Sequence, residues 1–189
     1  MTEITAQLDG ERNILLEIPP MANQRNICTS LLGDGVASPS VLFVTYTKQA
    51  IQCVEQIEGI DGIQNVGVIT VGDAATAVDS TGVVTESIST PSDLTGLGIQ
   101  IGQFLSEWES PVLVCFDSLT SMLQYVDFET AFEFLHAITG QIHAADARAH
   151  FHIDPGAHDQ TDVAAIASLC DARISLGDEV NIQTRDIVQ

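Results

Sequence analysis

The stretch Ile14–Leu32, ILLEIPPMANQRNICTSLL, decides the fold class of this chain. Its apolar run from Ile14 to Ile18 predicts a buried strand. Pro19-Pro20 ends that strand, because proline removes backbone donors and breaks regular pairing, and a helical pattern follows over Asn23–Leu32. A strand that leads into a helix in this way favours an α/β domain in which helices connect parallel strands.

A phosphate-binding loop would stand at this strand-to-helix junction. Such a loop needs glycines whose N–H groups surround the phosphates, a lysine for the terminal phosphates, and a Ser or Thr for magnesium. Residues 19–26 read PPMANQRN, with no glycine and no Gly-Lys-Ser/Thr triplet. We therefore expect a scaffold without its active loop, which favours binding or regulation over catalysis.

Strand-like and helix-like segments alternate along the rest of the chain. We expect further strands at 41–46, 66–71, 112–117 and 149–154, and helices at 48–57, 91–108, 127–142 and 160–169. Gly72–Thr90 is weakly patterned and has room for a short extra strand or hairpin, and 173–176 with 180–184 predict a C-terminal antiparallel hairpin. The pattern predicts one α/β domain over residues 1–189, a three-layer sandwich with a mostly parallel sheet.

Two helix starts carry recognisable signals. Thr90-Pro91-Ser92-Asp93 predicts a start with Thr90 as the cap and proline in the first turn. Asp159-Gln160-Thr161-Asp162 resembles a capping box.

The charge of the chain is extreme. Six Lys and Arg stand against 26 Asp and Glu, which gives a net charge of −20, and Lys48 is the one lysine. Such a surface repels itself in ordinary salt, whereas molar salt shortens the Debye length to about 3 Å. We expect a cytoplasmic protein of an organism that keeps molar salt inside the cell; a mesophilic acidic protein that binds a basic partner is the alternative. Direct nucleic-acid binding is disfavoured, because six scattered cations form no basic patch.

Neither export nor membrane insertion is expected from the sequence. The first residues are acidic and polar, unlike a secretory signal, and the longest apolar runs are strand-sized. The four cysteines, Cys28, Cys53, Cys115 and Cys170, form no C-x-x-C pair and lie in apolar segments. We interpret them as buried, reduced thiols of a reducing compartment.

Asp117 is the first candidate for chemistry. It follows the apolar run VLVCF at the carboxyl end of a strand, where open α/β sheets place their ligands. A strand-end acid of this kind holds magnesium in many nucleotide-binding folds. A cap for the following helical turn is an equally good interpretation, because a lone acid is not specific.

Three segments of the chain resemble RecA/KaiC-type proteins: LVCFD-SLTSML at 113–123, AHFHIDPGAHD at 149–159 and LCDARISL at 169–176. The likeness is greatest to small haloarchaeal members that lack the phosphate loop. The resemblance implies a RecA-like (P-loop NTPase-like) fold and self-association, with a homodimer favoured over a ring. In the ATPase members the second strand ends in catalytic glutamate, whereas Val44-Thr45-Tyr46-Thr47 holds no acid here. Asp117 alone matches the family's second acidic motif. Because of this departure from the family pattern we expect no catalytic residues and no ATP hydrolysis.

A residual nucleotide site is the first alternative. It would use Met21, Asn23, Arg25 and Asn26 at the junction, together with Asp117. Arg25 near the start of a helix would favour an anion, and Arg25 or Lys48 could stand in for the missing lysine. Pro19-Pro20 removes two backbone donors, so ATP and magnesium are disfavoured as cofactors.

A metal site is the second alternative. His150, His152 and Asp154 share one face of a strand, because residues two apart point the same way, and His158 follows after a short loop. Imidazoles and carboxylates are ligands that zinc selects. A plain strand end followed by an Asp154-Pro155-Gly156 turn explains the same residues without a metal.

We therefore expect a regulatory or adaptor protein, a pseudo-ATPase that acts through protein–protein contacts. The alternatives are a nucleotide-binding switch with an atypical phosphate site around Arg25 and Asp117, and a metal-dependent hydrolase that uses the histidine segment. The sequence names no partner protein.

Overall fold

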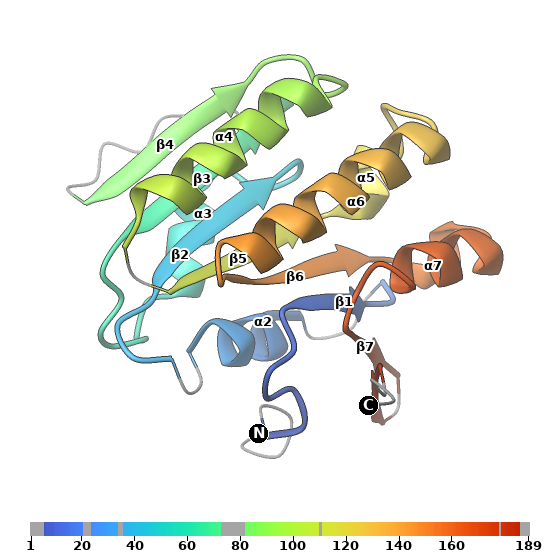
Figure 1. The fold of residues 1–189 in the computed structure, drawn as a ribbon, viewed down its shortest axis with the longest axis horizontal. Coiled ribbons are helices and arrows are strands. Elements are labelled where there is room, and N and C mark those ends of the chain that lie inside the picture. Colours follow the sequence, from blue (N-terminus) through green and yellow to red (C-terminus); the bar gives the residue numbers. More distant parts are fainter. Residues whose placement is uncertain are drawn as a thin grey trace.

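The computed structural model of the chain describes residues 6–20, 24–33, 36–72, 82–109, 111–177 and 179–185. A single sheet of eight strands forms its centre (Figure 1). In spatial order the strands are β4 (Val83–Ile88), β3 (Val66–Val71), β2 (Ser40–Thr45), β5 (Val112–Asp117), β6 (Arg148–Ile153), β1 (Asn13–Glu17), β7 (Ala172–Leu176) and β8 (Val180–Thr184).

All neighbouring strands pair in parallel except β7 and β8, which are antiparallel. The inner strands β1, β2 and β5 are buried along their whole length, as a sheet covered on both faces requires. The α/β class, the mostly parallel sheet and the C-terminal antiparallel pair expected from the sequence are therefore confirmed.

One face of the sheet carries the largest core. Helices α4 (Leu94–Glu107) and α6 (Phe128–Ala144) lie across it side by side, with α7 (Gln160–Ala167) beyond them (Figure 1). Gly67 of β3 lies where α4 comes close, because a Cβ there would stand 2.7 Å from the Phe104 ring. The residues of β5 and β6 that face this side are apolar, for example Phe116 and Phe151.

The opposite face is covered by α2 (Gln24–Gly33) and α3 (Ala50–Gln56). Leu31 of α2 packs with Ile14 and Leu16 of β1, and Cys53 of α3 packs with Phe43 of β2. The two helical layers enclose the sheet and make the three-layer sandwich. This second face also holds the buried polar side chains of β5 and β6 described below.

The weakly patterned segment from Gly72 to Thr90 contributes the edge strand β4, whereas residues 73–81 lie outside the described part of the chain. The start predicted for α4 was wrong, whereas the start of α7 at Asp159 is correct and only its capping box fails. Asp93, not Thr90, caps α4, because its carboxylate accepts the Gly96 N–H at 2.8 Å. Asp159 occupies the cap position of α7 without a side-chain hydrogen bond, so the capping box expected there does not form.

Two short helical turns complete the described part: α5 (Leu119–Met122) and the 3-10 turn η2 (Pro155–Ala157). They follow β5 and β6 directly, at the carboxyl ends of these strands. None of the helices in the described ranges is long and apolar enough to cross a membrane.

Candidate functional site

Carboxylate, ammonium, imidazole and thiol side chains come together near the carboxyl ends of β2, β5 and β6. Thr45 of β2 stands beside Asp117 of β5, and Cys115 stands beside His150 of β6, as Cα partners in the sheet. Because successive strand residues alternate between faces, Cys115 and Asp117 share a face, and so do His150 and His152. All four lie on the face covered by α2 and α3.

Asp117 forms an ion pair with Lys48. The ammonium Nζ lies 2.6 Å from Asp117 Oδ2, and the two side chains are 27% and 12% exposed. The turn after β2 delivers the lysine, because the Thr45 hydroxyl accepts the Lys48 backbone N–H at 2.8 Å. The second carboxylate oxygen, Oδ1, lies 3.4 Å from His152 Nδ1. Asp117 therefore has a basic group on each oxygen, and the cap of α5 comes from Ser118 instead.

Four buried side chains, Cys28, Cys115, His150 and His152, form what we call the thiol–imidazole cluster. His152 Nε2 lies 3.2 Å from Cys28 Sγ and 3.7 Å from Cys115 Sγ. The His150 and His152 rings stack with their centroids 5.2 Å apart. One ligand atom each from Cys28, His150 and His152 lie within 4.8 Å of one another. Helix α2 thus contributes one thiol to a cluster otherwise built from β5 and β6.

The charges of this region stabilise one another. Burial opposes ionisation of Asp117, but His152 and Lys48 outweigh it and hold the pKa of that carboxyl well below its usual value. Burial also disfavours a charged imidazole, yet Cys28 and Asp117 raise the pKa of His152 to about 9. The Cys115 hydrogen bond and the nearby His152 lower the pKa of Cys28, against the effect of burial.

The two remaining members of the cluster favour their neutral forms. The hydrogen bond to Cys28 and complete burial raise the pKa of Cys115, and burial lowers the pKa of His150. The cluster consequently favours a thiolate at Cys28 beside a protonated His152, with a neutral thiol and a neutral imidazole next to them. A thiolate is both the nucleophilic and the metal-binding form of cysteine.

The structure describes only some of the residues proposed for a nucleotide site. Met21 and Asn23 lie outside the described residues. Arg25 and Asn26 belong to the first turn of α2, and their side chains are outside the description. Asp117 is the one member whose surroundings are defined, and its carboxylate is engaged by Lys48 and His152.

The residues proposed for a metal site divide into two pairs. His150 and His152 come together with Cys28, whereas the described residues form no metal-ligand group of three or more that includes Asp154 or His158. The Asp154 carboxylate accepts the Gly156 N–H and so caps η2, as the turn interpretation expects. His158 Nε2 lies 3.0 Å from the Thr120 hydroxyl.

Sequence reasoning missed Cys28, Cys115 and the role of Lys48. All four cysteines are buried and free, as expected, but two of them face histidines rather than apolar side chains alone. The alternation along β5 was the available signal, because it places Cys115 on the face of Asp117. The contact with Cys28 depends on how α2 lies on the sheet, which no local pattern shows.

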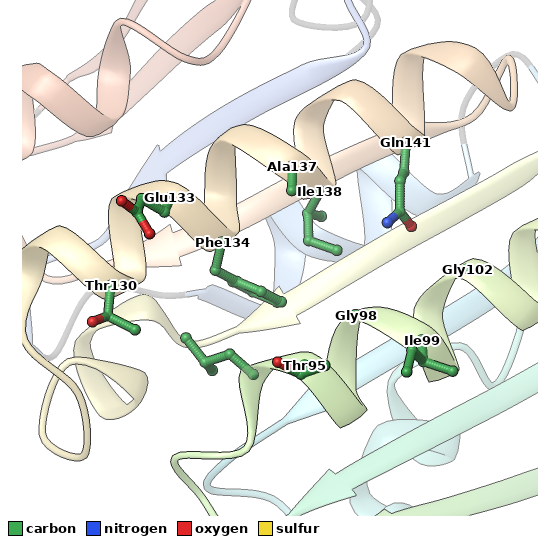
Figure 2. A pocket seen from close by; sticks show the side chains of 11 residues that line it. Thr95, Gly98, Ile99, Gly102, Thr130, Glu133, Phe134, Ala137, Ile138 and Gln141 are labelled. Carbon is green, nitrogen blue, oxygen red and sulfur yellow. The ribbon is translucent and has the colours of Figure 1, made fainter.

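A groove of about 590 Å³ runs between α4 and α6 on the other face of the sheet. Figure 2 shows Phe134 and Ile138 of α6 directed toward α4 at Gly98. A Cβ at Gly98 would lie 3.6 Å from Phe134 Cε2, so the missing side chain contributes to the hollow. Ile99 on its rim is 58% exposed. This groove is mainly apolar and does not include the thiol–imidazole cluster.

Solved structures with the same arrangement define the class of fold. Residues of this chain superpose on the protein PH0250 from Pyrococcus horikoshii with a TM-score of 0.63 at 12% identity, covering 97% of this chain and 93% of that one. A KaiC-like protein from the same organism, PH0186, gives a TM-score of 0.62 at 11% identity and 93% and 80% coverage. The flagellar accessory protein FlaH from Methanocaldococcus jannaschii gives 0.51 at 13% identity, with 90% and 75% coverage.

These similarities establish a RecA/KaiC-like fold but no function. The chain belongs to the family of unknown function DUF7504, whose model matches residues 12–176. Among curated protein sequences, none matches it. The matched range includes every residue of the thiol–imidazole cluster as well as Lys48 and Asp117.

Removal of the Lys48 ammonium tests the ion pair. Lys48→Met keeps most of the apolar stem but leaves the Asp117 carboxylate with His152 alone, and we expect it to lower the free energy of unfolding by about 1–3 kcal/mol. Urea unfolding measures the change. In a double-mutant cycle with Asp117→Asn, the two losses should sum to more than the loss in the double variant.

The exposed pair between Arg12 and Asp146 supplies the control for this experiment. Arg12→Met should cost about 1 kcal/mol or less, because solvent screens an exposed pair. Strict additivity of Lys48→Met and Asp117→Asn would show that the two groups do not interact.

Proposed function

We propose that this protein is a non-hydrolysing RecA/KaiC-like protein that acts through contacts with other proteins. The observation that carries the proposal is the double engagement of Asp117 by Lys48 and His152. Asp117 ends β5, the position at which many nucleotide-binding folds keep the acid that holds magnesium. In this chain the ammonium of Lys48 lies beside that acid.

The engaged carboxylate is poorly suited to magnesium. Mg²⁺ requires near-ideal octahedral geometry at about 2.0–2.1 Å from each oxygen and gives up its water reluctantly. Binding at Asp117 Oδ2 would have to displace Lys48 Nζ from 2.6 Å and leave that ammonium without its partner. The junction sequence PPMANQRN also lacks the glycines that would present backbone N–H groups to a phosphate.

Contact with a second copy of the chain is part of the proposal. The edge strands β4 and β8 end the sheet, and each exposes a valine, Val84 and Val180. Exposed strand edges offer unpaired backbone groups to another chain. We expect light scattering at molar KCl to give a mass of twice 20.2 kDa; a monomer mass across all protein concentrations would contradict self-association.

The proposed setting is a cytoplasm with molar salt. The net charge of −20 comes from acids distributed along the whole chain, and only six cations oppose them. Mutual repulsion among these acids opposes the compact state unless salt screens it.

The decisive experiment on nucleotide binding is thermal unfolding with and without Mg-ATP in molar KCl. A ligand that binds the native state raises the melting temperature by mass action. Because we expect no binding, the melting temperature should change by no more than about 1 °C at roughly 5 mM Mg-ATP. Steady-state phosphate release should equal the no-protein blank. A saturable shift that disappears in Asp117→Asn would refute the proposal and support the nucleotide-binding alternative.

The salt dependence of stability tests the proposed setting. Raising KCl from about 0.1 M to about 2 M should increase the melting temperature by about 5–10 °C, because the Debye length falls from about 10 Å to below 3 Å. Choline chloride at equal ionic strength should produce a similar rise if screening is the cause. A melting temperature that is flat or falls with salt would exclude the halophilic interpretation.

A further inference from the structure

We propose that the thiol–imidazole cluster is a closed zinc site in which Cys28, Cys115, His150 and His152 are the four ligands. The site lies beneath α2, and the ligands come from one helix and two strands, α2, β5 and β6. It differs from the histidine–aspartate set that the sequence suggested, because Asp154 and His158 are replaced by two thiols. It goes beyond the proposed function and does not depend on it.

The two distances from His152 to the thiols match those between ligands of a tetrahedral metal. Zinc bonds of about 2.3 Å to sulfur and 2.0–2.1 Å to nitrogen place neighbouring ligand atoms about 3.3–3.8 Å apart. His152 Nε2 lies 3.2 Å from Cys28 Sγ and 3.7 Å from Cys115 Sγ. Cys28, His150 and His152 each offer a ligand atom within 4.8 Å of the others. Cys115 Sγ lies outside this group of three, and it would have to move closer to complete a four-ligand site.

A buried nitrogen without a partner points to the same conclusion. His150 is 3% exposed, and its Nε2 has no hydrogen-bond partner among the described residues. Leaving such a nitrogen unpaired costs free energy, whereas a bond to a metal would satisfy it. Cys115, its Cα neighbour across the β5–β6 pairing, supplies the second sulfur on the same face.

Asp117 and Lys48 provide the support that a metal-bound histidine usually has. A ligating imidazole commonly directs its other ring nitrogen to a carboxylate, which fixes the orientation of the ring. His152 turns Nε2 toward the two thiols and has Nδ1 3.4 Å from Asp117 Oδ1. Lys48 in turn balances the charge of Asp117. The ion pair that closes the magnesium position therefore also positions a zinc ligand.

The chemistry of the donor set selects zinc and a structural role. Two sulfurs and two imidazoles in a tetrahedral arrangement are typical of zinc. Binding would release one proton from the Cys115 thiol and one from the His152 imidazolium, and two thiolates with two neutral imidazoles leave the buried Zn²⁺ site without net charge. Because all four positions are filled by the protein, no position remains for water or substrate. The metal would hold α2 on the sheet at the end of the chain's first strand-to-helix unit.

The test is metal analysis of the full chain, purified without an affinity tag and without chelator, and again after reconstitution with zinc sulfate. We expect about one zinc per chain with a dissociation constant tighter than about 1 µM. Cys28→Ser and His150→Gln should each lose the bound zinc. Cys170→Ser, which removes a buried cysteine outside the cluster, should retain it.

Cobalt spectroscopy of the unaltered protein keeps the proposal falsifiable if these variants fail to fold. Co²⁺ should give the visible bands of a tetrahedral ion and the near-ultraviolet band of a cobalt–thiolate bond, both removed by one equivalent of zinc. Chelator should lower the melting temperature of the parent and of Cys170→Ser. A folded parent protein that takes up neither zinc nor cobalt, or an unchanged zinc content in Cys28→Ser, would overturn the proposal.

Discussion

A buried carboxylate needs a positive partner, and the arrangement at the carboxyl ends of β2, β5 and β6 follows from this requirement at Asp117. Lys48 reaches one oxygen from the turn after β2, and His152 approaches the other from β6. That placement of His152 turns its second nitrogen toward Cys28 and Cys115. One acid therefore organises side chains from two strands, the turn after β2 and a helix, on the face that α2 and α3 cover.

Open α/β folds bind their ligands at the carboxyl ends of their strands, which is where these side chains meet. In this chain Lys48, Asp117, His152 and the two thiols fill that position themselves, with contacts of 2.6–3.7 Å. The groove of about 590 Å³ lies instead on the opposite face, between α4 and α6. The fold thus places the buried charged and thiol side chains on one face of the sheet and the open apolar groove on the other.

Periodicity predicted most of the fold because burial on both faces makes the strands nearly continuous apolar runs, such as VLVCF before Asp117. Periodicity did not predict the helix caps or the side-chain contacts that depend on residues distant in the sequence. Asp93 displaced Thr90 as the cap of α4, and a pattern of polar residues around Asp159 did not form its box. At the site, strand alternation correctly paired His150 with His152. Cys28 could not be predicted, because it is 124 positions from His152 in the sequence and only the packing of α2 brings the two together.

Lys48 is the single lysine of the chain, and it is mostly covered where it meets Asp117. An amine held as an ammonium against a carboxylate has no free electron pair for an electrophile. Within the side chains of this protein, amine acylation is thus limited to one position that reacts only when its ion pair opens. The acylation rate of Lys48 therefore reports how often the Lys48–Asp117 ion pair opens, and no other lysine contributes to the signal.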